Sequence, residues 1–548
     1  MQVFGLLFRG SEALGWRAIR ALWDGRILKR DLVIRGGTVF DGTGAPGKTD
    51  DILVRDGRIA EIGAVKCAEA SEIDAEGLFV SPGFIDIHSH SDYTLLVDPR
   101  AISALSQGVT LEVVGNCGHG CFPIVDKALA RNAIYGITDA VPLDWAGPAE
   151  YFARLEAARP AVNVLSLVPN GQLRQAAIGF ADRPATTDER REMLRHLEEG
   201  LEAGAFGLST GLEYPIEVAA DSREIEALLE PVARRGLLYA THTRRRDRGA
   251  VTAVEEAIET ARRAGVRLQV SHLLPRGGRG DSEACVERIE AARNAGQDVA
   301  FDMHTRTFAL TYLHAMLPPW AHATGLSGLK ALLEETGARE RIHAFPSIVN
   351  SGGWEQVTLL DNTVVPAFGR LDFGVIGRKL GMPPGDAALE LLCRSAAAES
   401  PLMIVRPVYD AEDQVLAFDH PLCVPGSDAT ALCPDGPLSG SAFHGAYSWA
   451  AWFYRFSVRE RGFLTPEAAI HKLTGQPARI LGLADRGTLR PGAPADIAVF
   501  DPSAFGERAT QWAPNQTAAG MIHVLVNGEL ALRDGVASAR RSGRVLRR

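Results

Sequence analysis

Residues that bind metal ions or transfer protons follow five short apolar runs of this 548-residue sequence. Imidazole nitrogens and thiolate sulfurs are donors that zinc prefers, and a carboxylate beside a zinc-activated water can accept its proton. A single buried histidine or cysteine is common in a hydrophobic core, but several of them at the ends of different apolar runs indicate a shared site. The sequence therefore predicts a hydrolytic zinc centre with the ligands His88, His90, Cys117, His242, His272 and Asp428.

The spacing within this set gives two further expectations. His88 and His90 are separated by a single residue at the end of the first run. Because side chains alternate along an extended strand, these two imidazoles point to the same side and can bind one metal together. Asp428 follows the last run and is the expected general base, and its alternative role is the N-cap of a helix.

The elements that must position these residues alternate between strands and helices. Helical patterns over residues 188–203, 222–235, 250–264 and 281–295 lie between apolar runs of strand length. Eight parallel strands in such an alternation predict an α/β fold, a (β/α)₈ TIM-like barrel whose site lies at the carboxyl ends of the strands. The expected strands are Gly83–Ile87, Val109–Val114, Val162–Val168, Ala205–Leu208, Leu237–Ala240, Arg267–Val270, Asp298–Phe301 and Pro421–Val424.

Two further parts interrupt or flank the barrel, which is expected over residues 83–483. The segment 303–420 is too long for one connection between a strand and a helix, so it is expected as an insertion over the barrel mouth. Short strands separated by Asp-Gly and Asn-Gly turns occupy residues 31–82 and return within residues 484–548. The two ends are expected to build one small β-sandwich.

The composition narrows the class of partner and the location. A net charge of −9 gives no basic field for nucleic acid, so the expected partner is a small molecule. Seven widely spaced cysteines favour reduced thiols in the cytoplasm over a disulfide framework. Residues 1–30 are expected to form a basic helical extension, for which packing on the domain or on a homo-oligomer neighbour is favoured over contact with a membrane surface.

Four sequence phrases resemble a known family. Ser81–His90 (SPGFIDIHSH) is similar to the strand that opens the barrel in the amidohydrolase superfamily. Gly115–Gly118 (GNCG), Gly207–Leu212 (GLSTGL) and Lys472–Ala478 (KLTGQPA) are similar to the D-aminoacylase branch, the N-acyl-D-amino-acid deacylases. Cys117 is the discriminating feature, because hydantoinases, dihydroorotases and ureases of the superfamily usually bridge two metals with a carboxylated lysine.

The resemblance implies roles for the predicted ligands. It implies one tightly held zinc on Cys117, His242 and His272. It also implies a second, weaker site on His88 and His90, bridged by the cysteine. Zinc with three protein donors keeps a position for water, lowers the pKa of that water toward about 7 and polarises the scissile carbonyl.

The substrate pocket is where the sequence departs from the family that it resembles. That family is expected to hold a substrate carboxylate with a lysine after the sixth strand and with a tyrosine and a serine after the seventh. Leu274, His304 and Leu310 stand at or near those positions here. Arg276 and Arg306 lie nearby in the sequence and can supply a guanidinium instead. His304, Arg306 and Arg276 are therefore the expected substrate-binding residues.

The expected function is hydrolysis of a non-peptide amide bond in a small molecule, most directly an N-acyl-D-amino acid or a related N-acyl amide. Metal-activated water is the nucleophile in this reading, and Asp428 acts as general base and then as acid. One alternative is a cyclic amidase or a deaminase on the same barrel, against which the lack of a strand-end lysine argues. The other is a non-catalytic barrel that a metal stabilises, against which the open ligand position argues.

Overall fold

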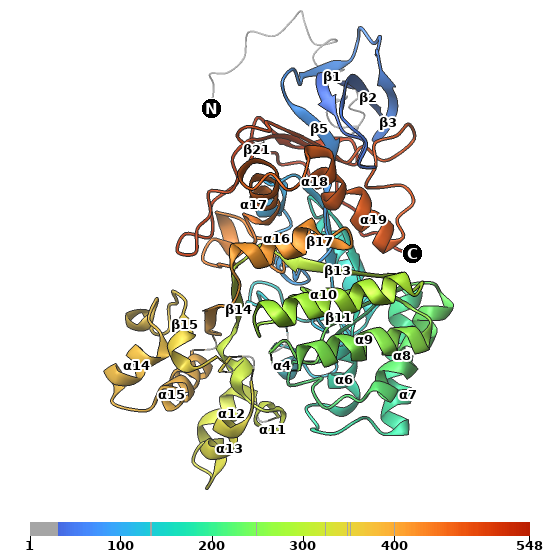
Figure 1. Ribbon diagram of the computed structural model, residues 1–548. Coiled ribbons are helices and arrows are strands. Elements are labelled where there is room, and N and C mark those ends of the chain that lie inside the picture. The colour runs from blue at the N-terminus through green and yellow to red at the C-terminus, as the bar shows by residue number, and fades with distance from the viewer. Residues whose placement is uncertain are drawn as a thin grey trace, which may run out of the picture.

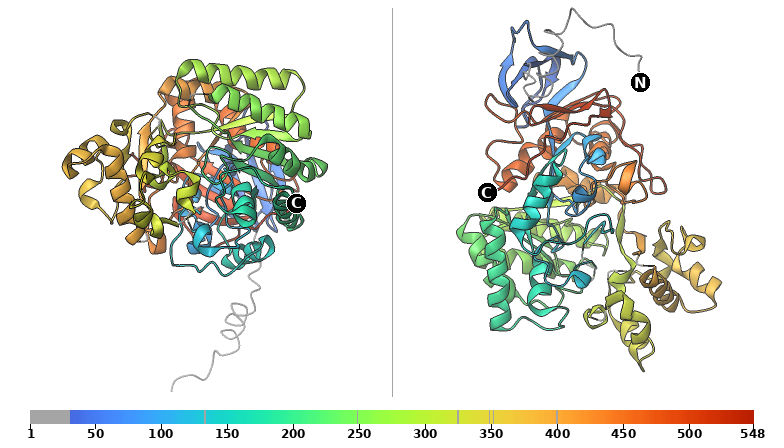
Figure 2. Two further views of the ribbon diagram at one scale, coloured as in Figure 1. Left: turned by 90° about the horizontal axis from the view of Figure 1, so that it is seen from below. Right: turned by 180° about the vertical axis from the view of Figure 1, so that it is seen from behind.

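The computed structural model describes residues 31–548 except positions 132–133, 248, 324, 348, 351 and 399 (Figure 1). The predicted helical extension over residues 1–30 lies outside these described residues. The chain forms a barrel, a sheet that caps one end of it, and a lobe beside it (Figures 1 and 2). Within the described part, no helix is long and apolar enough to cross a membrane.

The barrel is a ring of parallel strands in which every neighbouring pair runs in the same direction. A bridge between Ser89 and Ala429, and a 2.8 Å hydrogen bond from the amide of Asp428 to the carbonyl of His88, join the last strand to the first. All eight predicted strands are present, and β8 and β9 are two segments of the third. The strands are β6 (Phe84–Asp86), β7 (Val109–Val114), β8 (Asn163–Ser166), β9 (Val168–Pro169), β10 (Gly207–Gly211), β11 (Leu238–His242), β12 (Arg267–Val270), β13 (Val299–His304) and β17 (Cys423–Gly426).

Helices follow the strands and cover the outside of the ring. The four predicted helices are α7 to α10, each within two residues of the expected bounds. Thr186 and Glu189 form a capping box that fixes the start of α7. The helices of this part are α2 (Thr94–Val97), α3 (Ile102–Leu105), α4 (Lys127–Ala130), α5 (Pro148–Ala158), α6 (Asn170–Ile178), α7 (Thr187–Glu202), α8 (Ser222–Arg234), α9 (Ala250–Ala264), α10 (Arg279–Asn294), α16 (Ala411–Asp419), η4 (Gly436–Leu438), α17 (Trp449–Tyr454), η5 (Arg455–Glu460), α18 (Pro466–Leu473) and α19 (Gly475–Leu481).

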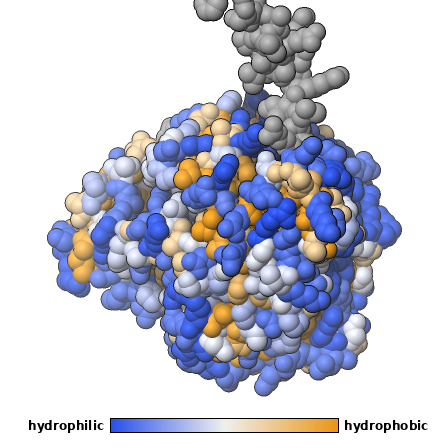
Figure 3. Space-filling view, turned by 90° about the horizontal axis from the view of Figure 1, so that it is seen from above, coloured by the Kyte–Doolittle hydropathy of each residue, from blue (hydrophilic) through white to orange (hydrophobic). Residues whose placement is uncertain are grey.

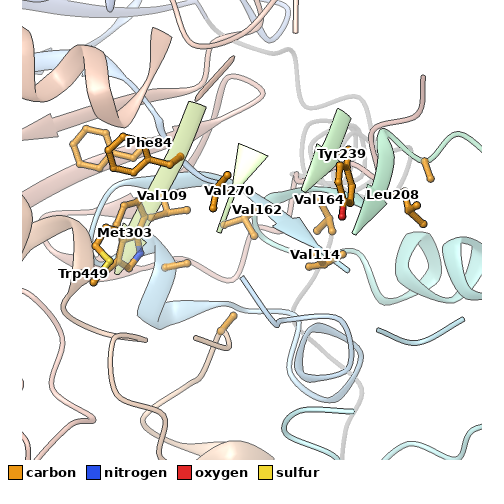
Figure 4. Packing of buried hydrophobic residues seen from close by; sticks show 14 of the residues in the cluster. Phe84, Val109, Val114, Val162, Val164, Leu208, Tyr239, Val270, Met303 and Trp449 are labelled. Atoms are coloured by element: carbon orange, nitrogen blue, oxygen red, sulfur yellow. The ribbon is translucent and has the colours of Figure 1, made fainter. Parts of the chain in front are cut away.

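Alternate strand residues build two separate apolar cores. Leu238 and Ala240 of β11 belong to the core inside the ring, whereas Tyr239 between them packs outward with residues of the surrounding helices. Figure 4 shows Tyr239 beside Leu208, its partner on the neighbouring strand β10. This alternation is the period-two pattern of a strand with two buried faces.

Strands from both ends of the chain pair in one nine-stranded sheet. Two tight turns shape it, at Asp56-Gly57 and at Asn527-Gly528, and all four residues have the positive φ that a type I′ hairpin requires. The description of this sheet as a sandwich stays a prediction. On the face seen from above in Figure 3, hydrophobic residues are scattered among hydrophilic ones. The strands are β1 (Leu32–Val39), β2 (Lys48–Arg55), β3 (Arg58–Gly63), β4 (Ser71–Asp74), β5 (Phe79–Pro82), β18 (Ile497–Phe500), β19 (Met521–Val526), β20 (Glu529–Arg533) and β21 (Val536–Ala537).

The segment between β13 and α16 forms the lobe, which has its own apolar core and a three-stranded antiparallel sheet. It projects to the side of the barrel (Figure 2). Its elements are β14 (Phe308–Tyr312), η1 (Leu313–Met316), α11 (Pro319–His322), α12 (Gly325–Leu332), α13 (Ala338–Ala344), η2 (Trp354–Gln356), β15 (Thr358–Leu359), η3 (Pro366–Phe368), α14 (Phe373–Leu380), α15 (Pro384–Ala397) and β16 (Met403–Pro407).

The predicted insertion range, 303–420, includes one helix that belongs to the barrel. α16 packs against α10 and β17, which is the position of the helix between the seventh and eighth strands. The range also takes in the last residues of β13, which continues to His304. The lobe is therefore shorter than the sequence pattern indicates, because a periodic helix inside a long excursion does not reveal which neighbour it packs on.

A buried ion pair between Arg174 of α6 and Glu224 of α8 offers a test of the barrel packing. Both side chains are 0% exposed. Glu224→Gln removes the carboxylate that pairs with this buried guanidinium, so we expect the free energy of unfolding to fall by about 3–5 kcal/mol. Urea denaturation followed by circular dichroism measures this loss.

The matched control is Asp188→Asn in the ion pair of Asp188 with Arg191, whose side chains are 87% and 71% exposed. This change should alter the free energy of unfolding by less than about 0.5 kcal/mol. An equal effect of the two substitutions would contradict the stabilising role of the buried pair.

Candidate metal centre

The six predicted ligands all lie at the carboxyl ends of barrel strands and share one mouth. His242 is the last residue of β11, and the others follow β6, β7, β12 and β17 within a few residues. The histidines and Cys117 are at most 3% exposed, whereas the side chain of Asp428 is 21% exposed. The site is thus nearly closed to solvent, and the Asp428 carboxylate is its most exposed member.

Three of these residues form a first donor cluster. The Sγ atom of Cys117 lies 3.2 Å from Nε2 of His88 and 3.5 Å from Nε2 of His272. All three donor atoms lie within 4.8 Å of one another. One ion can therefore contact a sulfur and two nitrogens here.

A second cluster shares His88 with the first. Oδ1 of Asp428 lies 3.2 Å from Nε2 of His90 and 3.7 Å from Nε2 of His88. The alternative role of Asp428 as a helix N-cap is not found, because the next helix, η4, begins at Gly436 after Asp435. Its side chain faces the imidazoles instead.

Backbone geometry holds several of these residues in an uncommon conformation. Cys117, His272 and Asp428 have φ values of 53°, 34° and 45°. Left-handed backbone costs on the order of 1–3 kcal/mol for a residue with a Cβ atom and persists only where its surroundings impose it. The backbone thus turns sharply after three strands, and these turns place the side chains of Cys117, His272 and Asp428 at the donor clusters.

His242 lies beside the clusters, but its Nε2 atom faces away from them. That atom is 2.8 Å from Oε2 of Glu213, and the His242 ring centroid is 4.6 Å from that of His272. The Nδ1 atom is buried and has no hydrogen-bond partner among the described residues. Burial lowers the pKa of His242 to about 4 despite Glu213, so the ring is neutral near pH 7 with one nitrogen unused.

Glu213 is a site residue that sequence reasoning missed. Its second oxygen accepts a hydrogen bond from Arg276, whose side chain is 4% exposed. Burial raises the pKa of Glu213, but Arg276 and His242 lower it to about 2. This arginine, predicted to bind substrate, therefore already has a carboxylate partner, and the row from Arg276 through Glu213 to His242 fixes the orientation of the imidazole.

Asp302 is the second missed residue. Its Oδ1 atom lies 3.0 Å from Nδ1 of His88 and accepts a 2.8 Å hydrogen bond from the amide of His272. A carboxylate on the far nitrogen of a metal-binding imidazole orients the ring and raises its basicity. The available signal was a lone acidic residue inside the apolar strand VAFDMH.

Arg306 is bound to the candidate base. Its NH2 atom donates to Oδ2 of Asp428 at 2.5 Å, and its NH1 atom donates to the carbonyls of Ser427, Asp428 and His444. Burial raises the pKa of Asp428, but the guanidinium and the His90 ring lower it by more, so that it lies well below the usual carboxyl range. The carboxylate is therefore ionised at neutral pH and held in place.

The donor set suits zinc. A thiolate with imidazoles is the combination that selects zinc among common divalent ions, and a carboxylate oxygen completes it. Burial lowers the pKa of His90 and places that of His272 well below its usual value, whereas for His88 the effect of burial is outweighed by Cys117 and Asp302, which raise its pKa. Imidazoles in the neutral form are the ones that bind metal. The unused, buried Nδ1 atom of His242 is a further donor within the same mouth.

A pocket opens onto these donors and carries an excess of cationic side chains. Arg246, Arg276 and Arg406 line it together with the predicted His304, and Leu310 lies on the same wall. Arg246 also donates to the carbonyls of His272 and Leu274 at 2.5 and 2.8 Å, which braces the loop after β12. Arg306 is not among the residues found to line this pocket.

The chain is similar to known proteins over most of its length. A family model described as Amidohydrolase family matches residues 71–364 and 430–531. An N-acyl-D-glutamate deacylase of Alcaligenes xylosoxydans xylosoxydans is 35% identical over 95% of this chain and 97% of that protein. The crystal structure of an N-acyl-D-glutamate deacylase from Bordetella bronchiseptica contains zinc and a phosphonate inhibitor that mimics the tetrahedral intermediate. It matches with a TM-score of 0.78 and 32% identity, over 95% of this chain and 100% of that one. A D-aminoacylase structure described for its binuclear metal centre matches with a TM-score of 0.78 and 30% identity, over 94% and 99%.

Proposed function

This chain belongs to the amidohydrolase family, in its D-aminoacylase branch, and from this premise we propose that it hydrolyses N-acyl-D-amino acids to a carboxylic acid and a free D-amino acid. The observation that carries the proposal is the cluster of Cys117, His88 and His272 beside Asp428. Metal-dependent hydrolysis fits this set, and the alternative of a non-catalytic barrel is set aside. The relatives that cleave N-acyl-D-glutamate support an acylated D-amino acid as substrate.

We propose that one zinc is held by Cys117, His242 and His272. A second, weaker site would use His88 and His90, with Asp428 and the shared sulfur. The D-aminoacylase neighbour with a binuclear centre supports two sites. Bound zinc would supply an activated water and polarise the scissile carbonyl.

Asp428 moves the proton in this proposal. Its ionised carboxylate accepts the proton that water loses, and it then protonates the nitrogen of the departing amine. Arg306 is a positioning residue, because its guanidinium holds one carboxylate oxygen while the other stays near His90. This differs from the expectation that Arg306 binds substrate, since Arg306 is not among the described residues that line the pocket.

We propose that Arg246, Arg276 and Arg406 receive the anionic end of the substrate. They line the pocket at the metal ligands. Leu274 stands at the position where the D-aminoacylase family is expected to have a lysine that binds the substrate carboxylate. The carboxylates of Glu213 and Asp247 act electrostatically on Arg276 and Arg406. Guanidinium groups match a carboxylate with paired N–H donors.

Arg406→Met tests this anion site. We expect KM for N-acetyl-D-glutamate to rise about 10- to 100-fold with a smaller change in kcat, because a hydrogen bond to a charged group contributes about 1.5–3 kcal/mol and holds substrate and transition state alike. Steady-state kinetics on the zinc-loaded enzyme measures both constants.

The control variant is Arg394→Met on α15, where the guanidinium pairs with Glu390 and is 45% exposed. It should leave KM within twofold of the parent value. A comparison substrate, an N-acetyl amine without a carboxylate, should respond equally little to Arg406→Met. A large effect on that neutral substrate would contradict the assignment of Arg406.

The proposed activity is tested with purified, zinc-loaded protein. N-acetyl-D-glutamate, its L enantiomer and a cyclic dihydropyrimidine are supplied separately, and the amine released is quantified by chromatography. We expect turnover of the D compound and at least tenfold less of the L compound. Preference for the cyclic amide, or no hydrolysis of acylated D-amino acids, would overturn the proposal.

We also propose a division of labour among the parts of the chain. The lobe within residues 303–420 closes the barrel mouth and supplies one wall of the substrate pocket, as Leu310, Ile404 and Arg406 support. Residues 83–483 are the catalytic barrel. Residues 31–82 and 484–548 form a β-sandwich that contributes no ligand.

A further inference from the structure

A second cavity adjoins the metal pocket and has a different character. The two share Tyr135, Tyr214 and Thr311 in their walls, so they adjoin at these side chains. The second cavity is lined elsewhere by residues that include Phe180, Ile216, Tyr312 and His322, and none of its described lining residues is Asp, Glu, Lys or Arg. We name it the aromatic cavity.

Ring contacts connect the aromatic cavity to the metal ligands. The Tyr135 ring lies 4.7 Å from that of His90, and the Tyr214 ring lies 4.7 Å from that of His242, measured between centroids. Tyr135 also stacks on Tyr312 of the lobe at 5.0 Å. Aromatic rings that line the aromatic cavity therefore lie directly beside two of the ligands.

The far end of the aromatic cavity is apolar at neutral pH. Phe180 stacks on His322 with ring centroids 5.4 Å apart and an interplanar angle of 14°. Burial lowers the pKa of His322 to about 4, so this imidazole is uncharged. The barrel supplies Phe180 and Ile216, and the lobe supplies Tyr312 and His322, so the two parts enclose the cavity together.

The pocket at the metal ligands thus has both arginines and aromatic residues in its walls. An N-acyl-D-amino acid has the matching polarity, since its scissile amide joins a carboxylate-bearing half to an acyl half. With the amide carbonyl at the metal ligands and the carboxylate on the arginines, the acyl group is left to contact the aromatic residues. An acetyl group would leave nearly all of that apolar surface uncovered.

We propose that the aromatic cavity is an acyl-binding site that selects substrates with a bulky apolar acyl group, such as an arylacetyl group, over acetylated ones. This inference rests on the proposed function. Each methylene-sized unit moved from water into an apolar site raises kcat/KM about fourfold when it stays bound in the transition state. Several such units in a phenylacetyl group give an expected preference of about 10- to 100-fold over acetyl.

The experiment compares kcat/KM for N-phenylacetyl-D-glutamate, N-acetyl-D-glutamate and N-acetyl-D-phenylalanine. The phenylacetyl compound should be the best of the three by at least tenfold. Phe180→Ala should shrink the ratio of phenylacetyl to acetyl at least fivefold, because it removes one face of the cavity. The matched control Phe368→Ala, a half-buried phenylalanine on the core of the lobe, should leave that ratio unchanged.

The outcomes separate this inference from the function on which it rests. Equal kcat/KM for the phenylacetyl and acetyl compounds would overturn the acyl site and leave the deacylase proposal standing. A preference for N-acetyl-D-phenylalanine that is reduced by Phe180→Ala would show that the cavity binds the amino-acid side chain. That result would also overturn the acyl-site proposal. No cleavage of any of the three compounds would overturn both proposals.

Discussion

Cys117→Ala is expected to remove the tightly held zinc and, with it, measurable amide hydrolysis. The sulfur lies 3.2 and 3.5 Å from the Nε2 atoms of His88 and His272. Without it the proposed tight site retains two imidazoles, and two neutral donors hold zinc poorly. Zinc content by mass spectrometry should fall from about one ion per chain or more to less than roughly a tenth.

The control for this prediction is Cys121→Ala. Cys121 is also fully buried and unpaired with another cysteine, but it lies outside both donor clusters. We expect this variant to keep its zinc and its activity. Full zinc occupancy and full activity in Cys117→Ala would show that the tight site lies elsewhere.

Asp428→Asn is expected to lower kcat by about 10²- to 10⁴-fold while at least one zinc is retained. The amide fills nearly the same space as the carboxylate, but it cannot take a proton from water. The tight site proposed on Cys117, His242 and His272 does not use this residue, so metal content and rate should separate. Stopped assays for kcat and elemental analysis of the same preparation provide the two measurements.

Asp435→Asn is the matched control for this substitution. Asp435 lies in the same loop, but its side chain is 72% exposed and pairs with Arg100. It should keep kcat within twofold of the parent enzyme. Turnover near the parent rate in Asp428→Asn would give the base role to another group.

The ligand set could be predicted from the sequence because barrel geometry converts a local pattern into a spatial one. Each apolar run marks a strand, and the residue after it must lie at the mouth with the others. His88, Cys117, His272 and Asp428 were found this way. In the structure each of them belongs to one or both of the two donor clusters, which share His88. No long-range information was needed for this step.

The partners of these ligands could not be predicted by the same reasoning. Asp302 looks like any polar residue inside a strand, and its contact with His88 joins positions 214 residues apart. The pairing of Arg276 with Glu213 could not be predicted either. The partner of a long, flexible side chain depends on which residues the fold brings near it. Whether a guanidinium such as that of Arg276 is paired with a carboxylate can therefore be seen only in the structure.

The sheet shows a similar limit. The turn residues Asp56-Gly57 and Asn527-Gly528 predicted hairpins at both ends of the chain, and both are present. The sequence did not indicate that β1 pairs with β4 along its first half and with β5 along its second. This change of partner coincides with the irregularity between Ile34 and Gly37, where the register with β2 shifts.

The pairing of β5 with β18 has a consequence for synthesis on the ribosome. β5 ends at Pro82 and its partner begins at Ile497, so more than 400 residues must be made before this edge is covered. At about 5–20 residues per second that interval lasts roughly 20–80 s. During it the nascent chain presents the unpaired edge of Phe79–Pro82, a template for pairing with other chains. Yield on overexpression should therefore depend on translation speed and on chaperones that shield this strand, more than on the stability of the finished fold.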